Sequence, residues 1–196
     1  MSNKKNNLMQ KVCVLTGIGF LAAGILLLVL WQTNIHTAQA QAAEHVHTLR
    51  TLMPEPQGTA LQARYDNTMS TLTLEDTTYI GILEMPQHGS ALPVCADWGK
   101  PNRQPCRFDG SLYDGSLVIG ATSQNGQYDF YREINVGEDV YFTDMEGNRC
   151  AFTVTNIRYE KHADQTALNR KEADLTLFIK NIYAFDYIVV FCDTAA

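Results

Sequence analysis

The stretch Asp174-Leu175-Thr176-Leu177-Phe178-Ile179-Lys180 decides the fold class of this chain. Its leucine, aromatic and β-branched residues form a short apolar run that is typical of a buried strand, and Lys180 ends it. Five further runs of this kind cover residues 79–83, 117–119, 139–143, 150–154 and 187–191, with a turn-forming segment at residues 144–148. Many short strands with few helices predict an all-β domain that closes into a barrel.

The 196-residue chain begins with a segment of a different kind. Residues 1–11 are polar and contain three lysines, whereas residues 12–31 form a charge-free run of 20 residues. At a rise of ~1.5 Å per residue, a helix of this length spans the ~30 Å hydrocarbon layer of a bilayer. No basic residue follows the run before Arg50. We therefore expect a cytoplasmic N-terminus (1–11), a transmembrane signal anchor (12–31) and an extracytoplasmic remainder.

A cleaved signal peptide is the alternative to an anchor, because Ala38-Gln39-Ala40 resembles a signal-peptidase site. The apolar region of a signal peptide usually has ~7–15 residues, and this run is longer. The candidate cleavage site also lies several residues beyond the run. A buried helix of a soluble protein is disfavoured because the run is apolar on every face.

Residues 32–77 are predicted to form an extracytoplasmic stalk and linker before a domain at residues 78–196. Residues 36–52 are rich in Ala, Gln, Glu and Leu, which favours a helix, and the prolines at 54 and 56 end it. A second short helix is expected at residues 59–69. His45 and His47 are two residues apart and face different sides of a helix, which favours a solvated helix over a metal site.

Residues 174–180 also resemble the active-site strand of the sortases, the cysteine transpeptidases of Gram-positive cell surfaces. In that family the strand runs Thr-Leu-x-Thr-Cys and ends on the nucleophile. Three further pieces follow in the family's order: residues 79–86 with Leu92-Pro93-Val94, residues 105–113, and Leu117-Val118-Ile119-Gly120-Ala121-Thr122. The resemblance covers roughly residues 78–192. It implies the sortase β-barrel of about eight strands, with a short helix at residues 129–134.

The resemblance places other residues where sortases have their catalytic Cys, His and Arg. Lys180 stands at the Cys position, Thr122 at the His position and Tyr187 at the Arg position, or Asp186 if the register slips by one residue. An ammonium with an ordinary pKa of ~10.4 cannot replace a thiolate without strong perturbation. The resemblance therefore implies a sortase-like pseudoenzyme with no intact catalytic residue.

Four cysteines lie beyond the apolar run: Cys95, Cys106, Cys150 and Cys192. They allow three disulfide connectivities, of which a local Cys95–Cys106 bridge is the simplest, and buried thiols are the alternative. A relocated cysteine nucleophile would need a nearby base or cation, and no Cys–His spacing indicates one. A Lys180–Thr122 base and nucleophile pair would need a desolvated lysine, which no sequence feature indicates.

The net charge of the chain and the motifs that it lacks disfavour several classes of partner and cofactor. Outside the N-terminal lysines the chain carries 12 basic and 21 acidic residues, a formal charge of −9. Such a surface disfavours nucleic acids and anionic wall polymers, which bind basic patches. Phosphate-loop, dinucleotide, EF-hand and zinc-ligand patterns are absent from the sequence, so we expect no cofactor and no metal.

The sequence thus predicts a single-pass membrane protein of the cell surface with a sortase-like domain outside. Its expected role is to hold a sorting-signal peptide, a pilin or an active sortase in the remnant groove, during surface-protein or pilus assembly. The alternative is an active transpeptidase or hydrolase with a rearranged site. A third interpretation treats the barrel as a scaffold and places the function in the stalk or loops.

The charge asymmetry gives a first testable prediction about topology. Protease added to intact cells should digest the domain that follows residue 31, because the lysines before the run keep the N-terminus inside. Immunoblotting against a C-terminal tag measures the loss. A tag that stays protected on intact cells, yet is digested after lysis, would reverse the orientation. A mature N-terminus near Gln41 would instead indicate the cleaved signal peptide.

Overall fold

A computed structural model describes residues 2–55, 67–99, 104–123, 132–161, 172–181 and 186–195 of the chain. The chain divides into two compact units, Met1–Thr37 and Ala38–Ala196. The second unit contains every strand in the described part of the chain.

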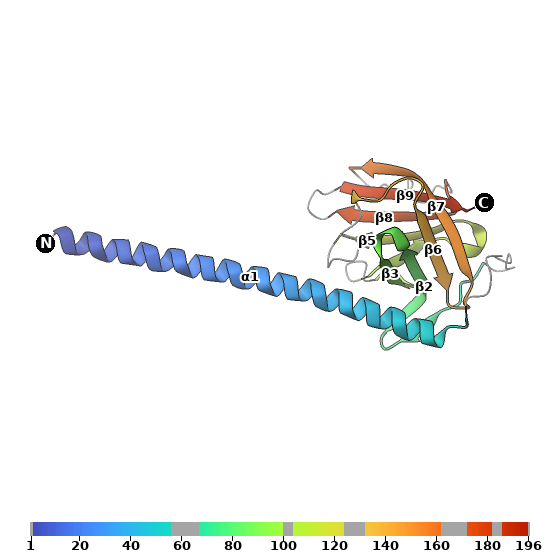
Figure 1. The fold of residues 1–196 in the computed structure, drawn as a ribbon, viewed down its shortest axis with the longest axis horizontal. Coiled ribbons are helices and arrows are strands. Elements are labelled where there is room, and N and C mark those ends of the chain that lie inside the picture. Colours follow the sequence, from blue (N-terminus) through green and yellow to red (C-terminus); the bar gives the residue numbers. More distant parts are fainter. Residues whose placement is uncertain are drawn as a thin grey trace. The chain divides into compact units, whose positions relative to one another are not determined.

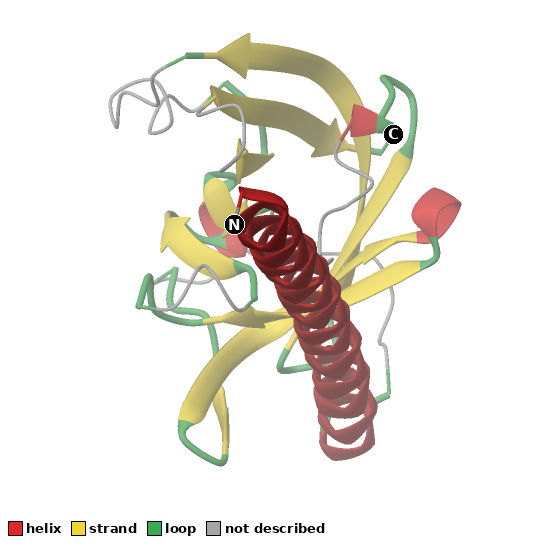
Figure 2. Cartoon of the chain, turned by 90° about the vertical axis from the view of Figure 1, so that its left-hand side faces the viewer, coloured by secondary structure: helices red, strands yellow, loops and turns green. Residues whose placement is uncertain are grey.

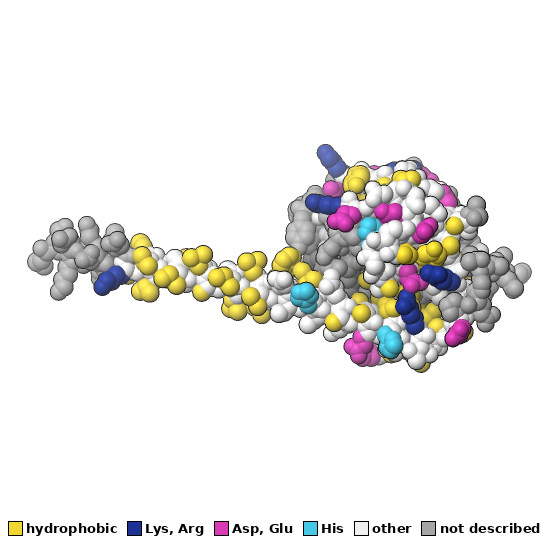
Figure 3. Space-filling model, in the orientation of Figure 1, with side chains coloured by type: hydrophobic (Ala, Val, Ile, Leu, Met, Phe, Trp, Pro, Cys, Tyr) yellow, Lys and Arg dark blue, Asp and Glu magenta, His cyan; other side chains and the backbone are white. Residues whose placement is uncertain are grey.

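One long helix, α1 (Ser2–Leu52), contains the predicted apolar run and the helical segment expected after it. Large apolar side chains between Val12 and Trp31 are exposed, and Figure 3 shows them along this part of the helix. By length and composition α1 is able to cross a membrane. The helix ends at Leu52, two residues before Pro54, where the ring would clash with a continued helix.

The second unit is an eight-stranded closed β-barrel with one added strand (Figures 1 and 2). Hydrogen-bonded neighbours follow the order β1-β2-β3-β4-β5-β8-β9-β7-β6, and a further pairing of β2 with β6 closes the ring. β1 lies outside the ring and pairs only with the start of β2. The strands are β1 (Leu72–Leu74), β2 (Thr77–Met85), β3 (Ser90–Cys95), β4 (Cys106–Asp109), β5 (Leu117–Thr122), β6 (Asp139–Asp144), β7 (Arg149–Glu160), β8 (Leu175–Asn181) and β9 (Asp186–Thr194).

The closed barrel confirms the predicted fold class, and all six predicted strands are present with longer bounds. The second half of β7 was missed because residues 156–160 are mostly polar, and only their pairing with β9 makes them a strand. β3 was missed because it contains Pro93, which has no backbone N–H to donate. β3 tolerates this proline because its pairing with β4 is limited to the Cys95–Cys106 position.

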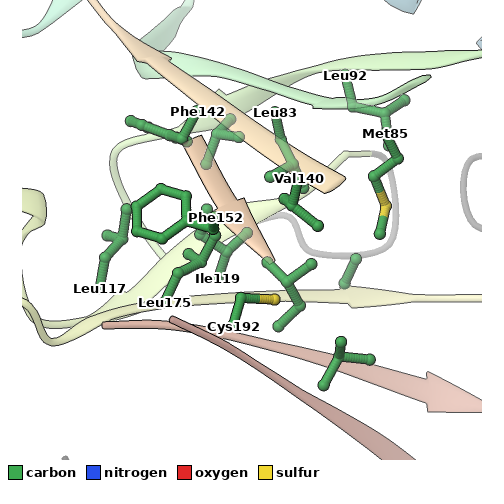
Figure 4. Close-up of a cluster of buried hydrophobic side chains, with 14 of the residues drawn as sticks. Leu83, Met85, Leu92, Leu117, Ile119, Val140, Phe142, Phe152, Leu175 and Cys192 are labelled. Carbon is green, nitrogen blue, oxygen red and sulfur yellow. The ribbon is translucent and has the colours of Figure 1, made fainter. Parts of the chain in front are cut away.

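Alternating residues of the strands fill the barrel interior (Figure 4). On the parallel pair β5 and β8, Leu117 and Ile119 lie opposite Leu175 and Leu177, and all four are essentially inaccessible to solvent. Phe142 and Phe152 fill the space between these strands and β6 and β7. Because side chains alternate across a strand, the residues between these positions face the outside of the barrel.

The last turns of α1 cover part of the outer face of the barrel. Val46 and Leu49 are buried in a second cluster with Tyr79, Ile82 and Cys95, and Ala42 is buried nearby. The compact unit thus begins at Ala38, within the segment expected as a stalk.

Polar contacts also hold this last part of α1 against the barrel. His45 Nδ1 lies 2.8 Å from the Tyr79 hydroxyl, and Glu84 binds both Arg50, at 2.5 Å, and Arg149, at 3.4 Å. The helix around these histidines is therefore only partly solvated, because the His45 ring is half-buried against β2 whereas His47 is exposed. Most of the helices expected at residues 59–69 and 129–134 fall outside the described residues. Two 3-10 turns, η1 (Pro86–His88) and η2 (Leu112–Asp114), are present.

The buried end of α1 yields a stability prediction with an internal control. Leu49→Ala should lower the free energy of unfolding by about 2–5 kcal/mol, because it leaves a cavity at a fully buried position. Leu52→Ala, in the same turn region but 56% exposed, should have little effect. Denaturant unfolding of the detergent-solubilised chain measures both. Equal destabilisation by the two variants would contradict the packing of this helix on the barrel.

Candidate functional site at the ends of β5, β8 and β9

Three neighbouring strands bring the three predicted site residues together. In the parallel pair β5–β8, Thr122 lies directly opposite Lys180, and in the antiparallel pair β8–β9, Lys180 lies directly opposite Tyr187. Adjacent strands are ~4.8 Å apart, so the three residues form a continuous row across β5, β8 and β9, strands that Figure 1 labels. We call Thr122, Lys180 and Tyr187 the three-strand row. Asp186 lies opposite Asn181 instead.

The row faces the outside of the barrel. Leu175, Leu177 and Ile179 belong to the interior cluster, so Phe178 and Lys180 project from the other face of β8. Val189 and Phe191 of β9 pack with Phe178 in a separate outer cluster, and Tyr187 packs against its edge. Asp186, by the same alternation, faces the barrel interior. The single-residue slip considered from the sequence would therefore change the face as well as the position.

The three side chains of the row differ in burial. Thr122 is 6% exposed, and its Oγ1 has no hydrogen-bond partner among the described residues. Lys180 is exposed, and Tyr187 is half-buried. Beyond the strand pairing, the Ser123 backbone N–H donates to the Lys180 carbonyl oxygen at 2.9 Å. This bond continues the β5–β8 register one residue past Thr122 and fixes the row's backbone.

An aromatic surface adjoins the row. We call Trp98, Phe108 and Phe178 the aromatic shelf: their ring centroids are 5.2–5.3 Å apart, with edge-on contacts at Phe108. Gly120 of β5 lies beneath it, because a Cβ there would be 2.2 Å from Phe178 and 2.6 Å from Trp98. The rings of Trp98 and Phe178 can therefore pack directly against the β5 backbone only because residue 120 has no side chain. Trp98 is 40% exposed and presents an apolar surface to solvent.

The cysteines of the barrel unit lie away from the row. Cys192 is inside the barrel, where burial, with a smaller contribution from Asp193, raises the pKa of its thiol. Burial and then the Asp144 carboxylate raise the pKa of Cys150 to about 11. Both thiols therefore stay protonated at neutral pH, and a protonated thiol is a poor nucleophile.

Cys95 and Cys106 lie in the cluster beneath α1 and are direct partners across β3 and β4. Both contact Gln104: its side-chain Nε2 donates to Cys95 Sγ at 2.7 Å, and Cys106 Sγ donates to its backbone carbonyl oxygen at 3.4 Å. Cys95 and Cys106 are register partners, but none of the four cysteines of the barrel unit forms a disulfide in this structure, and all four are buried. The structure therefore agrees with the alternative of buried thiols.

A cavity of about 670 Å³ lies on another part of the barrel unit. Three of its charged groups are paired, since Glu84 binds both Arg50 and Arg149. It is lined by Arg50, Thr51, Met53, Pro54, Glu55, Ile82, Glu84, Thr143 and Arg149. None of these residues comes from β5, β8 or β9, so this cavity is separate from the three-strand row.

Solved structures share this barrel. A sortase C1 from Streptococcus suis matches with a TM-score of 0.52 at 19% identity, over 60% of this chain and 73% of the other. A sortase A from Corynebacterium diphtheriae matches at 0.53 and 14% identity, over 83% and 84%. This chain has the sortase fold.

A third match is the sortase D5 transpeptidase of Clostridium perfringens, at 0.52 and 12% identity over 60% of this chain and 79% of that one. No protein-family model and no curated protein sequence matches this chain. At these identities the sortase likeness establishes the architecture only.

The sequence interpretation missed the aromatic shelf. One signal for it was present: Gly120 interrupts an apolar strand run, and an isolated glycine in a strand often marks a close approach of another group. What approaches could not be read, because Trp98 and Phe108 come from elsewhere in the chain and reach β8 only through the order β3-β4-β5-β8.

The geometry of the row can be tested by installing a thiol. In Lys180→Cys, the pKa of the new thiol should fall by about 1–3 units when Thr122→His is added, because a neighbouring imidazolium stabilises the thiolate. The pH dependence of iodoacetamide alkylation measures this pKa. The matched control, Thr122→Gln with Lys180→Cys, adds a neutral side chain and should leave it unchanged. An identical alkylation profile for both pairs would contradict the neighbouring placement of residues 122 and 180.

Proposed function

We propose that this chain is a membrane-anchored sortase-fold protein that binds a peptide or a partner protein and does not catalyse transpeptidation. The observation that carries the proposal is the composition of the three-strand row. In the positions that resemble those of the catalytic Cys, His and Arg of sortases, this barrel has Lys180, Thr122 and Tyr187. An ammonium, a hydroxyl and a phenol provide neither a thiolate nor an imidazole base.

Among the described residues, the rest of the barrel shows no replacement for these catalytic groups. Transpeptidation through a thioacyl intermediate needs a nucleophilic thiolate and a base close to it. Burial keeps the Cys150 and Cys192 thiols protonated, and Cys95 and Cys106 lie beneath α1. A base role for Lys180 would need desolvation, yet this residue is exposed. These features favour binding over the alternative of a rearranged active site.

A surface for binding remains on the outer face beside the row. The aromatic shelf offers exposed apolar area at Trp98, and the row offers polar groups at its end. The candidate ligands are a sorting-signal peptide, a pilin or an active sortase, in surface-protein or pilus assembly.

We further propose that α1 anchors the chain with residues 12–31 in the membrane, and that residues 32–77 lead to the barrel domain at 78–196 on the extracellular side.

A peptide-cleavage assay tests the proposal. The full-length chain in detergent should not cleave a fluorogenic Leu-Pro-x-Thr-Gly peptide above background, because the covalent pathway has lost its nucleophile. Lys180→Cys alone should recover little, since the loss of one general acid or base costs ~10²–10⁴-fold. Adding Thr122→His to Lys180→Cys should raise cleavage above that of the single variant. Wild-type cleavage that a thiol alkylator abolishes would overturn the proposal and assign catalysis to one of the native cysteines.

A further inference from the structure

The three-strand row presents hydrogen-bond donors that the described protein leaves unused. Thr122 Oγ1 is buried and has no hydrogen-bond partner in the described part of the chain. The Lys180 ammonium and the Tyr187 hydroxyl also make no hydrogen bond or ion pair with any residue the structure describes. A buried polar group that stays unpaired costs free energy, so a ligand that pairs with Thr122 recovers this cost on binding.

The chemistry of the row selects an anion. An ammonium has three donors and no acceptor, and each hydroxyl can add one donor. The row is therefore a line of donors with one positive charge, spread over two strand spacings of ~4.8 Å each. Asp186, the acidic residue nearest in register, is opposite Asn181 and faces the barrel interior. A carboxylate accepts several hydrogen bonds at once and matches the single charge of Lys180.

The position of the aromatic shelf relative to Lys180 indicates what kind of molecule carries that carboxylate. Phe178 precedes Lys180 by two residues on the same face of β8, a separation of ~7 Å along the strand. An extended peptide repeats at the same distance, since its alternate residues are also ~7 Å apart. A peptide whose carboxylate meets Lys180 can therefore place an apolar side chain against Trp98 and Phe178, one repeat away.

We propose that the three-strand row binds the free carboxylate at the C-terminus of an extended peptide, with an apolar residue two positions earlier on the aromatic shelf. This inference rests on the proposed binding function and names the class of ligand that the three-strand row takes. Such a ligand is the product side of a peptide cleavage rather than an intact internal segment, because an internal segment has an amide where the row offers a cation.

A randomised peptide library tests the inference. Acetylated tetrapeptides with a free C-terminal carboxylate and the same library as C-terminal amides are passed over the immobilised full-length chain, and retained peptides are identified by mass spectrometry. The free acids should be enriched about fivefold over the amides, as expected for one partly exposed ion pair. Apolar residues should be enriched at the second position before the C-terminal residue, and Trp98→Ala should remove that enrichment.

Matched variants separate the row from general effects. Lys180→Gln should abolish the preference for free acids, whereas Lys161→Gln, which also neutralises an exposed lysine, should leave it unchanged. Thr122→Val keeps the shape of the side chain and removes its unpaired hydroxyl. It should therefore reduce the preference while leaving the melting temperature unchanged or higher.

Each outcome of the library experiment decides a separate point. Equal retention of free acids and amides overturns the carboxylate site and leaves the proposed peptide binding intact. Retention of amides that carry Asp or Glu, lost in Lys180→Gln, replaces the C-terminal carboxylate by a side-chain carboxylate and overturns the terminal assignment. Retention of neither library overturns both this inference and the peptide-binding form of the proposed function.

Discussion

The parallel pairing of β5 with β8 is the constraint on which the rest of this structure depends. Six consecutive positions pair without interruption, from Leu117 opposite Leu175 to Thr122 opposite Lys180. A shift of one residue would move Leu175, Leu177 and Ile179 from the barrel interior to its outer face. Burial of these side chains therefore fixes the register. Because the register is fixed, Thr122 and Lys180 must be neighbours, whatever their own chemistry.

The β5–β8 pairing also explains why the side chains of the three-strand row can be replaced while the barrel fold is kept. The interior positions carry the packing free energy, and the outer positions at the strand ends carry little of it. Lys180 is exposed and Tyr187 half-buried, so other side chains could occupy these positions without opening the core. Thr122 is the exception, since it is buried with an unpaired hydroxyl. A valine would have the same shape without burying an unpaired hydroxyl.

The placement of the thiols follows from the same division between inner and outer faces. Cys192 lies on an interior position of β9, where desolvation favours the neutral thiol. Cys95 and Cys106 face outwards but are covered by the last turns of α1. Two parts of the outer face of the barrel therefore differ in their exposure. The last turns of α1 cover one part, and the other part carries the aromatic shelf and the three-strand row.

The sequence by itself determined the type of each long element and the identity of the row. Short apolar runs predicted six strands because burial on a pleated sheet favours such residues, and the charge-free run predicted the long helix. The resemblance to the sortases also placed Thr122, Lys180 and Tyr187 at the ends of three strands. The sequence could not show β3, which contains a proline, or the polar half of β7, because pairing partners alone make these segments strands.

Only the tertiary structure decided which faces these residues share and what lies beside them. Trp98 and Phe108 are far from Phe178 in the chain, and their rings meet because β4, β5 and β8 are neighbours in the sheet. His45 was assigned to solvent from its helix position, yet the packing of Val46 and Leu49 on β2 brings it to Tyr79. The physical reason is common to both cases. Local patterns report the burial of a residue in its own element, whereas contacts between elements depend on the order and register of the closed sheet.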